Sequence, residues 1–270
     1  MRLIDTHSHL YEPEFDEDRD AAVERARAAG VERLIFPAID AESHGRMFDT
    51  ARRYAGYCAV MMGLHPTSVN DNPRWREELA EVEHYLTTTP PEGIDRFVAV
   101  GEIGLDFYWS RDYIEEQREA FLVQLRLAAR LGLPVAIHTR SAWPEMVEML
   151  EREARAAHER GERLCGVLHA FSDGVESYRR LLKAGDFKFG IGGVVTFKKS
   201  PLAEVVREMA LEDMLLETDC PYLTPAPFRG KRNESGYISY ICQKIAELKG
   251  VGADEVARIT TENARELFGL

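Results

Sequence analysis

The sequence is poor in cysteine, and its few cysteines do not form a recognisable motif. Its 270 residues include four of them, and no two are spaced as Cys-x-x-Cys. The absence of this spacing argues against a zinc finger, and the small number of cysteines argues against a disulfide-stapled extracellular domain. We therefore expect buried, apolar free thiols at Cys58, Cys165, Cys220 and Cys242.

Long apolar runs are also missing. No stretch approaches the ~20 apolar residues that a helix needs to cross a bilayer. The chain enters Leu3-Ile4-Asp5 without the basic region and apolar segment of a signal peptide. We therefore expect a cytoplasmic protein with no membrane segment. The sequence does not fix an oligomeric state, and a monomer is compatible with it.

Positive charge is in deficit. The chain has 34 lysines and arginines against 46 aspartates and glutamates, a net charge of −12. Tight, sequence-independent binding of nucleic acid depends on lysine and arginine replacing counterions, so this balance argues against it. It leaves open an enzyme that holds a few phosphates through divalent metal ions and a local basic loop.

What the sequence does have is an alternation of short apolar runs with amphipathic stretches. Runs rich in Val, Ile, Leu, Phe and Met indicate parallel strands buried on both faces. The strands that we predict are Leu3–Asp5, Arg33–Pro37, Cys58–Gly63, Phe97–Gly101, Pro134–Ile137, Leu164–Leu168, Phe187–Ile191 and Met214–Thr218. Helical periodicity is clear over Asp18–Ala29, Glu115–Leu131, Pro144–Glu159 and Gly174–Lys183.

This alternation predicts an α/β fold, a (β/α)8 TIM barrel. Strands and helices at this spacing favour right-handed βαβ units, and eight of them favour closure. The chain length is also near the ~250 residues typical of such a barrel. Without a linker or repeat, we predict one domain over residues 1–270, with a terminal helix over Asp254–Leu270. Gly30, Gly132, Gly161 and Gly185 are expected to end helices with positive φ.

Metal-binding side chains recur at the ends of the predicted strands. His7 and His9 follow the first strand, and the other ends carry Glu102, His138, His169 and Asp219. The carboxyl ends of barrel strands share one rim, so these six residues should converge there. Two imidazoles on alternate positions face the same way, which lets His7 and His9 reach one ion.

These residue types predict a centre with two divalent ions. Imidazole and carboxylate ligands suit Zn, Mn, Fe or Ni better than Ca, and Mg is also possible. Glu102 has two oxygens and could bridge the ions, His138 and His169 could hold the second, and Asp219 could also accept a proton from water. Singly, each residue has a plainer explanation: Asp219 could cap a turn, and Glu102 could pair with an arginine. The remaining histidines, His44, His84 and His158, lie in charged helical contexts and are expected at the surface.

Five motifs resemble the TatD-type metal-dependent hydrolases, or TatD-related DNases, of the amidohydrolase superfamily. The similarity covers essentially the whole chain. The motifs are Ile4-Asp5-Thr6-His7-Ser8-His9-Leu10, Gly63-Leu64-His65-Pro66, Gly101-Glu102-Ile103-Gly104-Leu105-Asp106-Phe107-Tyr108-Trp109, Leu133-Pro134-Val135-Ala136-Ile137-His138-Thr139-Arg140, and Leu216-Glu217-Thr218-Asp219-Cys220-Pro221-Tyr222-Leu223-Thr224-Pro225 with its continuation Arg229-Gly230-Lys231-Arg232-Asn233-Glu234.

The resemblance implies roles for particular residues. One metal would bind His7, His9, Glu102 and Asp219, and the other would bind Glu102, His138 and His169. His65 would lie near the scissile phosphate, unless it only fixes the turn at Pro66. Ser235 stands where the family often has proline, which predicts a more mobile loop. The run Ala170-Phe171-Ser172-Asp173 also departs from the family's usual Cys-Phe-Ser-Gly.

Basic and aromatic residues on predicted rim loops are the candidates for substrate binding. Arg140 and the cluster of Arg229, Lys231 and Arg232 could hold phosphate oxygens. Alternatively, Arg232 and Glu234 simply tie down their loop. The run Phe107-Tyr108-Trp109 could stack on an unpaired base, although we expect at least two of the three to pack within the loop.

Nuclease activity is the function that the sequence favours. We predict phosphodiester hydrolysis at DNA ends, of the 3′–5′ exonuclease type with single strands preferred, and with DNA a more probable nucleic-acid substrate than RNA. The alternative is an amidohydrolase or aminoacyl-tRNA deacylase, since one metal site serves several chemistries. A non-catalytic, metal-stabilised binding protein is disfavoured because the Asp219 position is filled.

Overall fold

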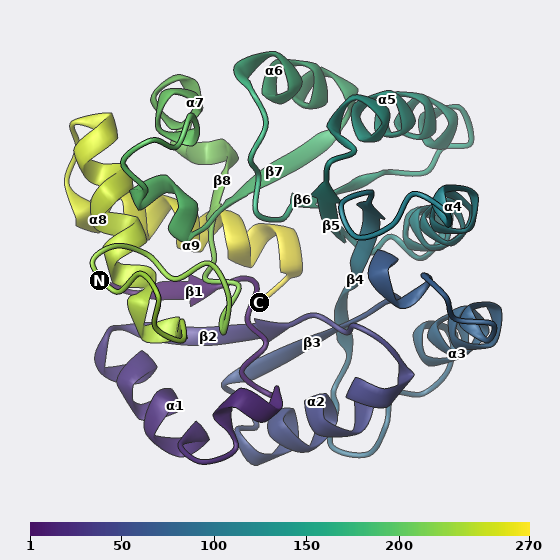
Figure 1. The fold of residues 1–270 in the computed structure, drawn as a ribbon, viewed down its shortest axis with the longest axis horizontal. Helices are drawn as coiled ribbons and strands as arrows, with labels where there is room; N and C mark the ends of the chain where they lie inside the picture. Colours follow the sequence, from purple (N-terminus) through teal and green to yellow (C-terminus); the bar gives the residue numbers. More distant parts are fainter.

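Eight parallel strands form a barrel surrounded by helices (Figure 1). The computed structural model describes residues 1–270. The strands are β1 (Leu3–Asp5), β2 (Val31–Phe36), β3 (Cys58–Met62), β4 (Phe97–Asp106), β5 (Val135–Arg140), β6 (Cys165–Leu168), β7 (Asp186–Ile191) and β8 (Met214–Leu216). The helices are α1 (Arg19–Ala28), α2 (Ala41–Arg53), α3 (Trp75–Thr87), α4 (Ile114–Leu131), α5 (Trp143–Glu159), α6 (Val175–Ala184), α7 (Leu202–Glu208), α8 (Ile238–Lys249) and α9 (Ala253–Phe268). Short 3₁₀ turns include η2 (Pro66–Ser68), η3 (Gly193–Thr196) and η5 (Ser235–Tyr237).

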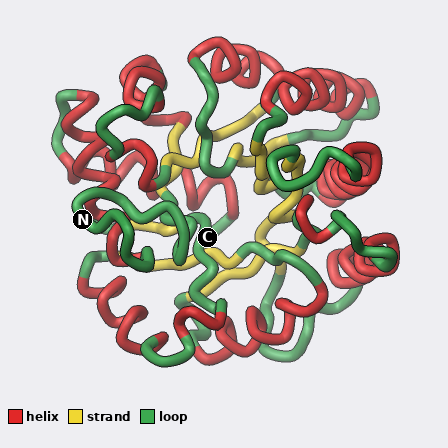
Figure 2. Tube along the Cα trace, viewed as in Figure 1, coloured by secondary structure: helices red, strands yellow, loops and turns green.

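The strands follow one another around the barrel in chain order. Each of the first seven pairs in parallel with the next, and helices lie outside the yellow strands in Figure 2. Closure between β8 and β1 is less regular. It consists of backbone hydrogen bonds from Thr6 to Leu216 (3.1 Å), from Asp219 to His7 (2.9 Å) and from His9 to Cys220 (2.9 Å). The predicted (β/α)8 barrel is therefore confirmed.

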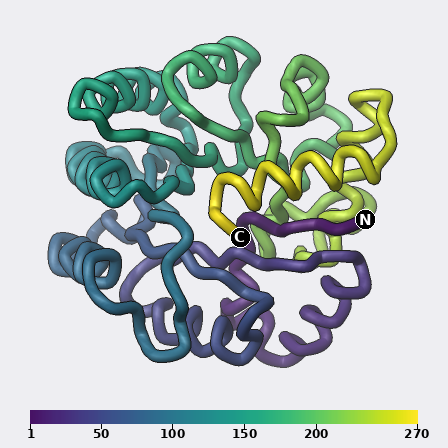
Figure 3. The backbone as a smooth tube through the Cα atoms, turned by 180° about the vertical axis from the view of Figure 1, so that it is seen from behind, coloured from purple at the N-terminus to yellow at the C-terminus, as the bar shows by residue number.

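The inside of the barrel is a small apolar core closed by the last helix. One inward-facing cluster takes residues from seven strands together with Ala264 and Phe268 of α9. Its strand members are Ile4, Ile35, Met61, Val98, Ala99, Ala136, Val167 and Leu215. Figure 3 shows α9, in yellow, lying across this end of the barrel beside β1. Because this end is plugged, an active site can open only at the other end, where the strands terminate.

Several predicted boundaries were wrong, most of all for β4 and β5. The predicted strand at 97–101 continues to Asp106, and the one at 134–137 continues to Arg140, because the two strands pair along this whole extension. Glu102 and His138 are therefore inside strands rather than just after them. In contrast, β8 ends at Leu216, two residues early.

Smaller expectations about helices and single residues gave mixed results. Gly30, Gly132 and Gly161 have positive φ as expected, but Gly185 is extended at φ −173°. His44 is buried against Phe48 and Tyr85 rather than at the surface. The four cysteines are free thiols, three of them buried. No helix is both long enough and apolar enough to cross a membrane.

Candidate metal centre

Five histidines surround the carboxylate of Glu102 at the open end of the barrel. Oxygen Oε2 lies 3.0 Å from His7 Nε2 and 3.8 Å from His9 Nε2. Oxygen Oε1 lies 3.0 Å from His138 Nδ1, 3.6 Å from His65 Nε2 and 3.8 Å from His169 Nε2. The two oxygens thus face different histidines, as a bridging carboxylate would.

Asp219 approaches the same histidines from the other side. Its Oδ1 lies 3.4 Å from His9 Nε2, 3.6 Å from His169 Nε2 and 4.0 Å from His7 Nε2. The structure therefore brings together all six residues that the sequence singled out, from strands or strand ends of β1, β4, β5, β6 and β8.

Local backbone geometry sets the position of Glu102. The register between β4 and β5 shifts between Gly101 and Ile103, so Glu102 lies at an irregularity in an otherwise continuous strand. The adjacent glycines permit close strand contact: a Cβ on Gly104 would stand 2.0 Å from the His138 carbonyl oxygen. Only glycine allows β4 to lie this near to β5, and that proximity brings Glu102 to His138.

Asp219 lies in a conformation that side chains rarely adopt. Its φ is +55°, in the left-handed region, and its N–H donates to the His7 carbonyl oxygen at 2.9 Å. Ala170, directly after His169, is also left-handed at φ +44°. Strained residues of this kind concentrate at functional sites, where the surrounding structure holds them.

Three further side chains fix the histidine rings, and our sequence analysis gave none of them a role at the site. Tyr11 Oη donates to the Pro37 carbonyl oxygen at 2.7 Å and lies 3.1 Å from His9 Nδ1. Because the Tyr11 hydroxyl proton is already used, the His9 Nδ1–H donates to Tyr11 Oη. Asp106 Oδ2 lies 2.9 Å from His138 Nε2, and Glu217 Oε1 lies 3.1 Å from His169 Nδ1. In each case the ring's other nitrogen is turned toward Glu102 or Asp219. Outer partners of this kind orient metal ligands in many proteins.

The charge of the site is carried by buried groups with no basic partner other than histidine. Burial disfavours ionisation of Glu102, yet the nearby imidazoles, His7 first, hold its pKa well below its usual range. Burial likewise opposes ionisation of Asp219, but His169 and its neighbours lower the Asp219 pKa. No arginine or lysine pairs with Glu102, which removes the plainer explanation for that residue. Both carboxylates are therefore ionised at neutral pH.

Two of the imidazoles are held protonated in the metal-free protein. Burial lowers the pKa of His138, but hydrogen bonds to Asp106 and Glu102 outweigh it and raise the pKa to about 9. Burial is similarly outweighed at His169 by Glu217, Asp219 and Glu102, which raise its pKa to about 10. Metal ions and protons would therefore compete for these nitrogens.

The residues present fit a divalent metal. Nitrogen and oxygen donors lie within 4.8 Å of one another in three overlapping groups: His7, His9 and Glu102; His65, Glu102 and His138; and His7, His169 and Asp219. Histidine nitrogens mixed with carboxylate oxygens suit Zn, Mn, Fe or Ni. The grouping differs from the arrangement implied by resemblance: His169 and Asp219 lie together with His7, and His65 rather than His169 lies with Glu102 and His138. The His7 and His169 rings stack, with centroids 3.4 Å apart.

His65 is placed as a hydrogen-bond donor. Its Nδ1 accepts from the backbone N–H of Thr67 at 3.2 Å, so the proton of the neutral ring resides on Nε2. Burial lowers the pKa of His65, which favours that neutral form. The same contact caps η2 beside Pro66, so His65 fixes this turn and also directs an N–H into the site.

The site opens into a cavity of about 600 Å³, which we name the rim cleft. Arg140 and His65 line it together with every metal-binding candidate except His7, whereas Arg229 and Arg232 do not. Arg229 lies over the Phe197 ring at 3.6 Å, and Arg232 binds Asp18 at 2.7 Å and stacks on Phe15. Arg232 and Glu234 both tie down their loop, since Glu234 binds Arg25 at 2.7 Å. The lining of the rim cleft is His9, Ile39, His65, Thr67, Glu102, Asp106, Trp109, His138, Thr139, Arg140, His169, Ala170, Ser172, Val194, Asp219, Tyr222 and Leu223.

The loop that was expected to be mobile is instead held in place. Ser235 is fully buried in η5, and its hydroxyl lies 3.1 Å from Ser8 Oγ. Asn233 adds hydrogen bonds to the carbonyl oxygens of Thr218 (2.8 Å) and Tyr222 (2.6 Å). The serine that replaces proline thus exchanges a rigid ring for a hydrogen bond to the segment between His7 and His9.

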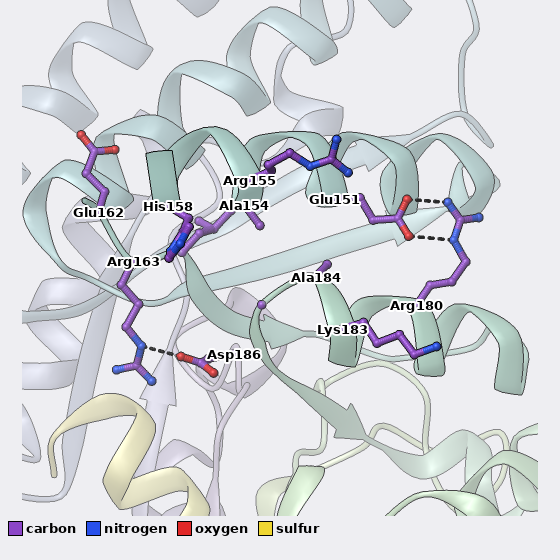
Figure 4. A pocket seen from close by; sticks show the side chains of 12 residues that line it. Glu151, Ala154, Arg155, His158, Glu162, Arg163, Arg180, Lys183, Ala184 and Asp186 are labelled. Atoms are coloured by element: carbon purple, nitrogen blue, oxygen red, sulfur yellow. Dashed lines mark hydrogen bonds and ion pairs between the residues drawn. The ribbon is translucent and has the colours of Figure 1, made fainter. Parts of the chain in front are cut away.

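A second cavity, of about 640 Å³, lies between α5 and α6 beside the amino-terminal ends of β6 and β7. We name it the helix cavity. Figure 4 shows two ion pairs along it, Glu151 with Arg180 and Arg163 with Asp186. Neither metal-binding candidates nor strained residues line this cavity.

The chain resembles known proteins over its full length. The family model described as TatD related DNase matches residues 4–269. YabD of Bacillus subtilis, named an uncharacterized metal-dependent hydrolase, is 38% identical over 268 residues, covering 98% of each chain. A protein of Pectobacterium parmentieri named 3′-5′ ssDNA/RNA exonuclease TatD is 34% identical over 275 residues, covering 99% of this chain and 100% of its own.

The fold is likewise that of a solved relative. The crystal structure of YjjV, a TatD homologue from Escherichia coli, superposes with a TM-score of 0.88 at 31% identity. The superposition covers 100% of this chain and 98% of the other.

Proposed function

The chain belongs to the TatD-related DNase family of metal-dependent hydrolases, and we propose that it is a nuclease that removes nucleotides from the 3′ ends of single-stranded DNA. The observation that carries this proposal is the cluster around Glu102, where ionised carboxylates and imidazoles meet in a cleft that also holds Arg140 and His65. A phosphodiester needs both a hydrolytic centre and donors for its oxygens, and this cleft contains the two together.

The proposal gives the six predicted ligands to two divalent ions. His7, His9 and Asp219 would hold one ion and His138 and His169 the other, with Glu102 shared. When bound, such ions lower the pKa of water and stabilise charge on phosphoryl oxygens. Glu102 is central because each of its oxygens faces a different set of histidines.

Asp219 is the proposed proton acceptor. Its carboxylate is ionised, faces the rim cleft and keeps some exposure, 15% of the side chain. It can therefore take the proton of an attacking water. The left-handed backbone at this residue and the Asp219 N–H bond to His7 would hold the carboxylate in place as the proton moves.

His65 and Arg140 are the proposed contacts to the phosphate. The His65 Nε2–H points into the cleft, and a neutral imidazole can donate there without repelling a cation. Arg140 forms no ion pair within the protein, so its guanidinium is available for phosphate oxygens. Arg229 and Arg232, which the sequence also suggested, lie outside the cleft lining and would contact only a longer strand.

An end-labelled single-stranded oligonucleotide tests the proposal. Protein stripped with a chelator would receive Mg²⁺, Mn²⁺ or Zn²⁺, with Asp219→Asn as the inactive variant and Asp186→Asn, in the helix cavity, as a matched control. We expect metal-dependent loss of nucleotides from the 3′ end by the wild type and by Asp186→Asn only. Intact DNA under every metal would contradict the nuclease proposal. Release of the amino acid from charged tRNA without shortening of the RNA would then indicate the acyl-hydrolase alternative.

A further inference from the structure

Large apolar side chains that are exposed gather at the rim cleft. Trp109 (68% exposed) and Tyr222 (51%) line the cleft, and Tyr108 (57%) directly precedes Trp109. The other two tryptophans, Trp75 and Trp143, are buried at 4% and 9%. Exposing an aromatic ring forgoes the stabilisation of burying it, so a concentrated group of exposed rings marks a binding surface.

The run Phe107-Tyr108-Trp109 does not pack into its own loop as the sequence led us to expect. Only Phe107 is buried. Tyr108 and Trp109 contact each other edge to face, with centroids 5.1 Å apart. The guanidinium carbon of Arg140 lies 3.7 Å from the Tyr108 centroid and 5.4 Å from the Trp109 centroid. Cation–π contact of this kind orders the rings while leaving them open to a ligand.

The aromatic pair is attached rigidly to the metal centre. Asp106 holds His138 Nε2 with one oxygen, and with the other it accepts the Tyr108 backbone N–H at 3.0 Å. The Phe107 N–H donates to the Arg140 carbonyl oxygen at 2.9 Å. A single carboxylate thus connects the aromatic loop to a histidine of the metal site, which fixes the distance between them.

We propose that Trp109, held edge to face by Tyr108 and ordered with it by Arg140, forms a platform that stacks on an unpaired nucleobase next to the scissile phosphate. This inference rests on the proposed function and deepens it by giving a physical source of single-strand preference. A stacked aromatic side chain needs a base face, and inside a duplex both faces are covered by neighbouring bases. The guanidinium of Arg140 would hold the adjoining phosphate while its face stays on Tyr108.

Tryptophan fluorescence tests stacking without requiring turnover. Trp109 is the one exposed tryptophan, so quenching by an added base reports on it. The probe is a thymidine trinucleotide, compared with a trinucleotide of the same charge that lacks all three bases, both added to the Asp219→Asn protein. We expect quenching by the thymidine probe only, and none in the Asp219→Asn protein that also carries Trp109→Phe. Equal quenching by both probes, or none by either, would overturn the platform.

Kinetics then separate the platform from the nuclease activity itself. Trp109→Ala should raise KM for a single-stranded oligonucleotide roughly tenfold, as expected for one lost base stack. Trp109→Phe should restore most of the loss, and Tyr240→Ala, an exposed aromatic on α8, should have no effect. With a substrate whose 3′-terminal residues lack bases, Trp109→Ala should equal the wild type.

Failure of the platform proposal can be distinguished from failure of the nuclease proposal. If the wild type degrades DNA and Trp109→Ala leaves KM unchanged, the platform is wrong and the nuclease proposal stands. If the wild type degrades no nucleic acid while the thymidine probe still quenches Trp109, the nuclease proposal is wrong and a base-binding surface remains. Absence of both signals would overturn both.

Discussion

The rim cleft and the helix cavity have nearly the same volume, about 600 and 640 Å³, and both are lined by charged residues. They differ in which groups lie opposite their carboxylates. In the helix cavity, exposed arginines pair with exposed carboxylates, as Arg163 does with Asp186 (Figure 4). In the rim cleft, the Glu102 and Asp219 carboxylates face only imidazoles, and left-handed residues border them.

Neither the volume of a cavity nor the number of charges in its lining identifies a functional site. Exposed ion pairs contribute little to the free energy of folding and are common on protein surfaces. Buried carboxylates that face only histidines, whose rings are held by outer partners, are instead typical of functional sites.

Substitution of Glu102, the proposed shared ligand, should have the largest effect. Glu102→Ala removes both oxygens that face the two histidine sets, so we expect activity to fall by at least roughly 10²-fold and bound metal to fall with it. Glu151→Ala, which removes an ion pair of the helix cavity, should leave both unchanged. Metal analysis of the purified variants, with activity on the same samples, checks the prediction. A Glu102→Ala protein with full activity and full metal content would refute the site.

Outer partners should matter less than ligands but more than surface charges. Glu217→Gln and Asp106→Asn keep the side-chain size while removing the charge beside His169 and His138. We expect metal affinity to weaken by about 10- to 100-fold in each. Titration of the chelator-treated protein with Mn²⁺ or Zn²⁺ measures the metal affinity, and Asp186→Asn serves as the matched control. Affinities equal to that control would show that these carboxylates do not support the site.

Alanine substitution of an arginine should change KM in the rim cleft but not in the helix cavity. Arg140→Ala should raise KM for a short oligonucleotide by roughly tenfold or more, because a charged hydrogen bond to phosphate is lost. Arg155→Ala, in the helix cavity, should not change KM. Arg229→Ala with Arg232→Ala should raise KM only for longer strands and not for a small phosphodiester. If the double variant impairs the small substrate equally, these arginines do not act by gripping the backbone.

Proton release should accompany metal binding in the rim cleft. In the metal-free protein the pKa values of His138 and His169 are raised to about 9 and 10, so both rings are charged at pH 7.5 and must lose protons when they bind metal. The corresponding stabilisation of the metal-free fold is complete below pH 6.5 and is lost as the pH rises through about 9 to 10. Calorimetry of metal binding in buffers of different ionisation enthalpy measures the release. Binding that is independent of the buffer would contradict this assignment.

Much of this architecture could be predicted from the sequence because the strands and the candidate ligands at the rim have strong local signals. The continuous apolar run before His138 directly indicates a buried strand. The His7-Ser8-His9 spacing directly indicates two imidazoles that face the same way. His44 was predicted at the surface from its charged neighbours, although Met47, Phe48 and Ala51 follow at helical spacing on the same buried face. Periodicity was the better guide there.

What escaped prediction depends on contacts between distant segments. The extension of β4 through Asp106 follows from its pairing with β5, and glycines at 101 and 104 gave the contrary local signal of a strand end. Glu217 supports His169 because β6 and β8 converge on the same rim, although an acidic residue in an apolar run was a usable hint. The intramolecular partners of Arg232 lie more than 200 residues away in the sequence, so no local pattern could reveal them.

Anomalous diffraction from crystals soaked in Mn²⁺ would locate the bound metal ions. We predict two peaks in the rim cleft on either side of Glu102, one near His7, His9 and Asp219 and one near His138 and His169, and both absent in Glu102→Ala. Peaks confined to the helix cavity or other surface carboxylates, with none beside Glu102, would contradict the account.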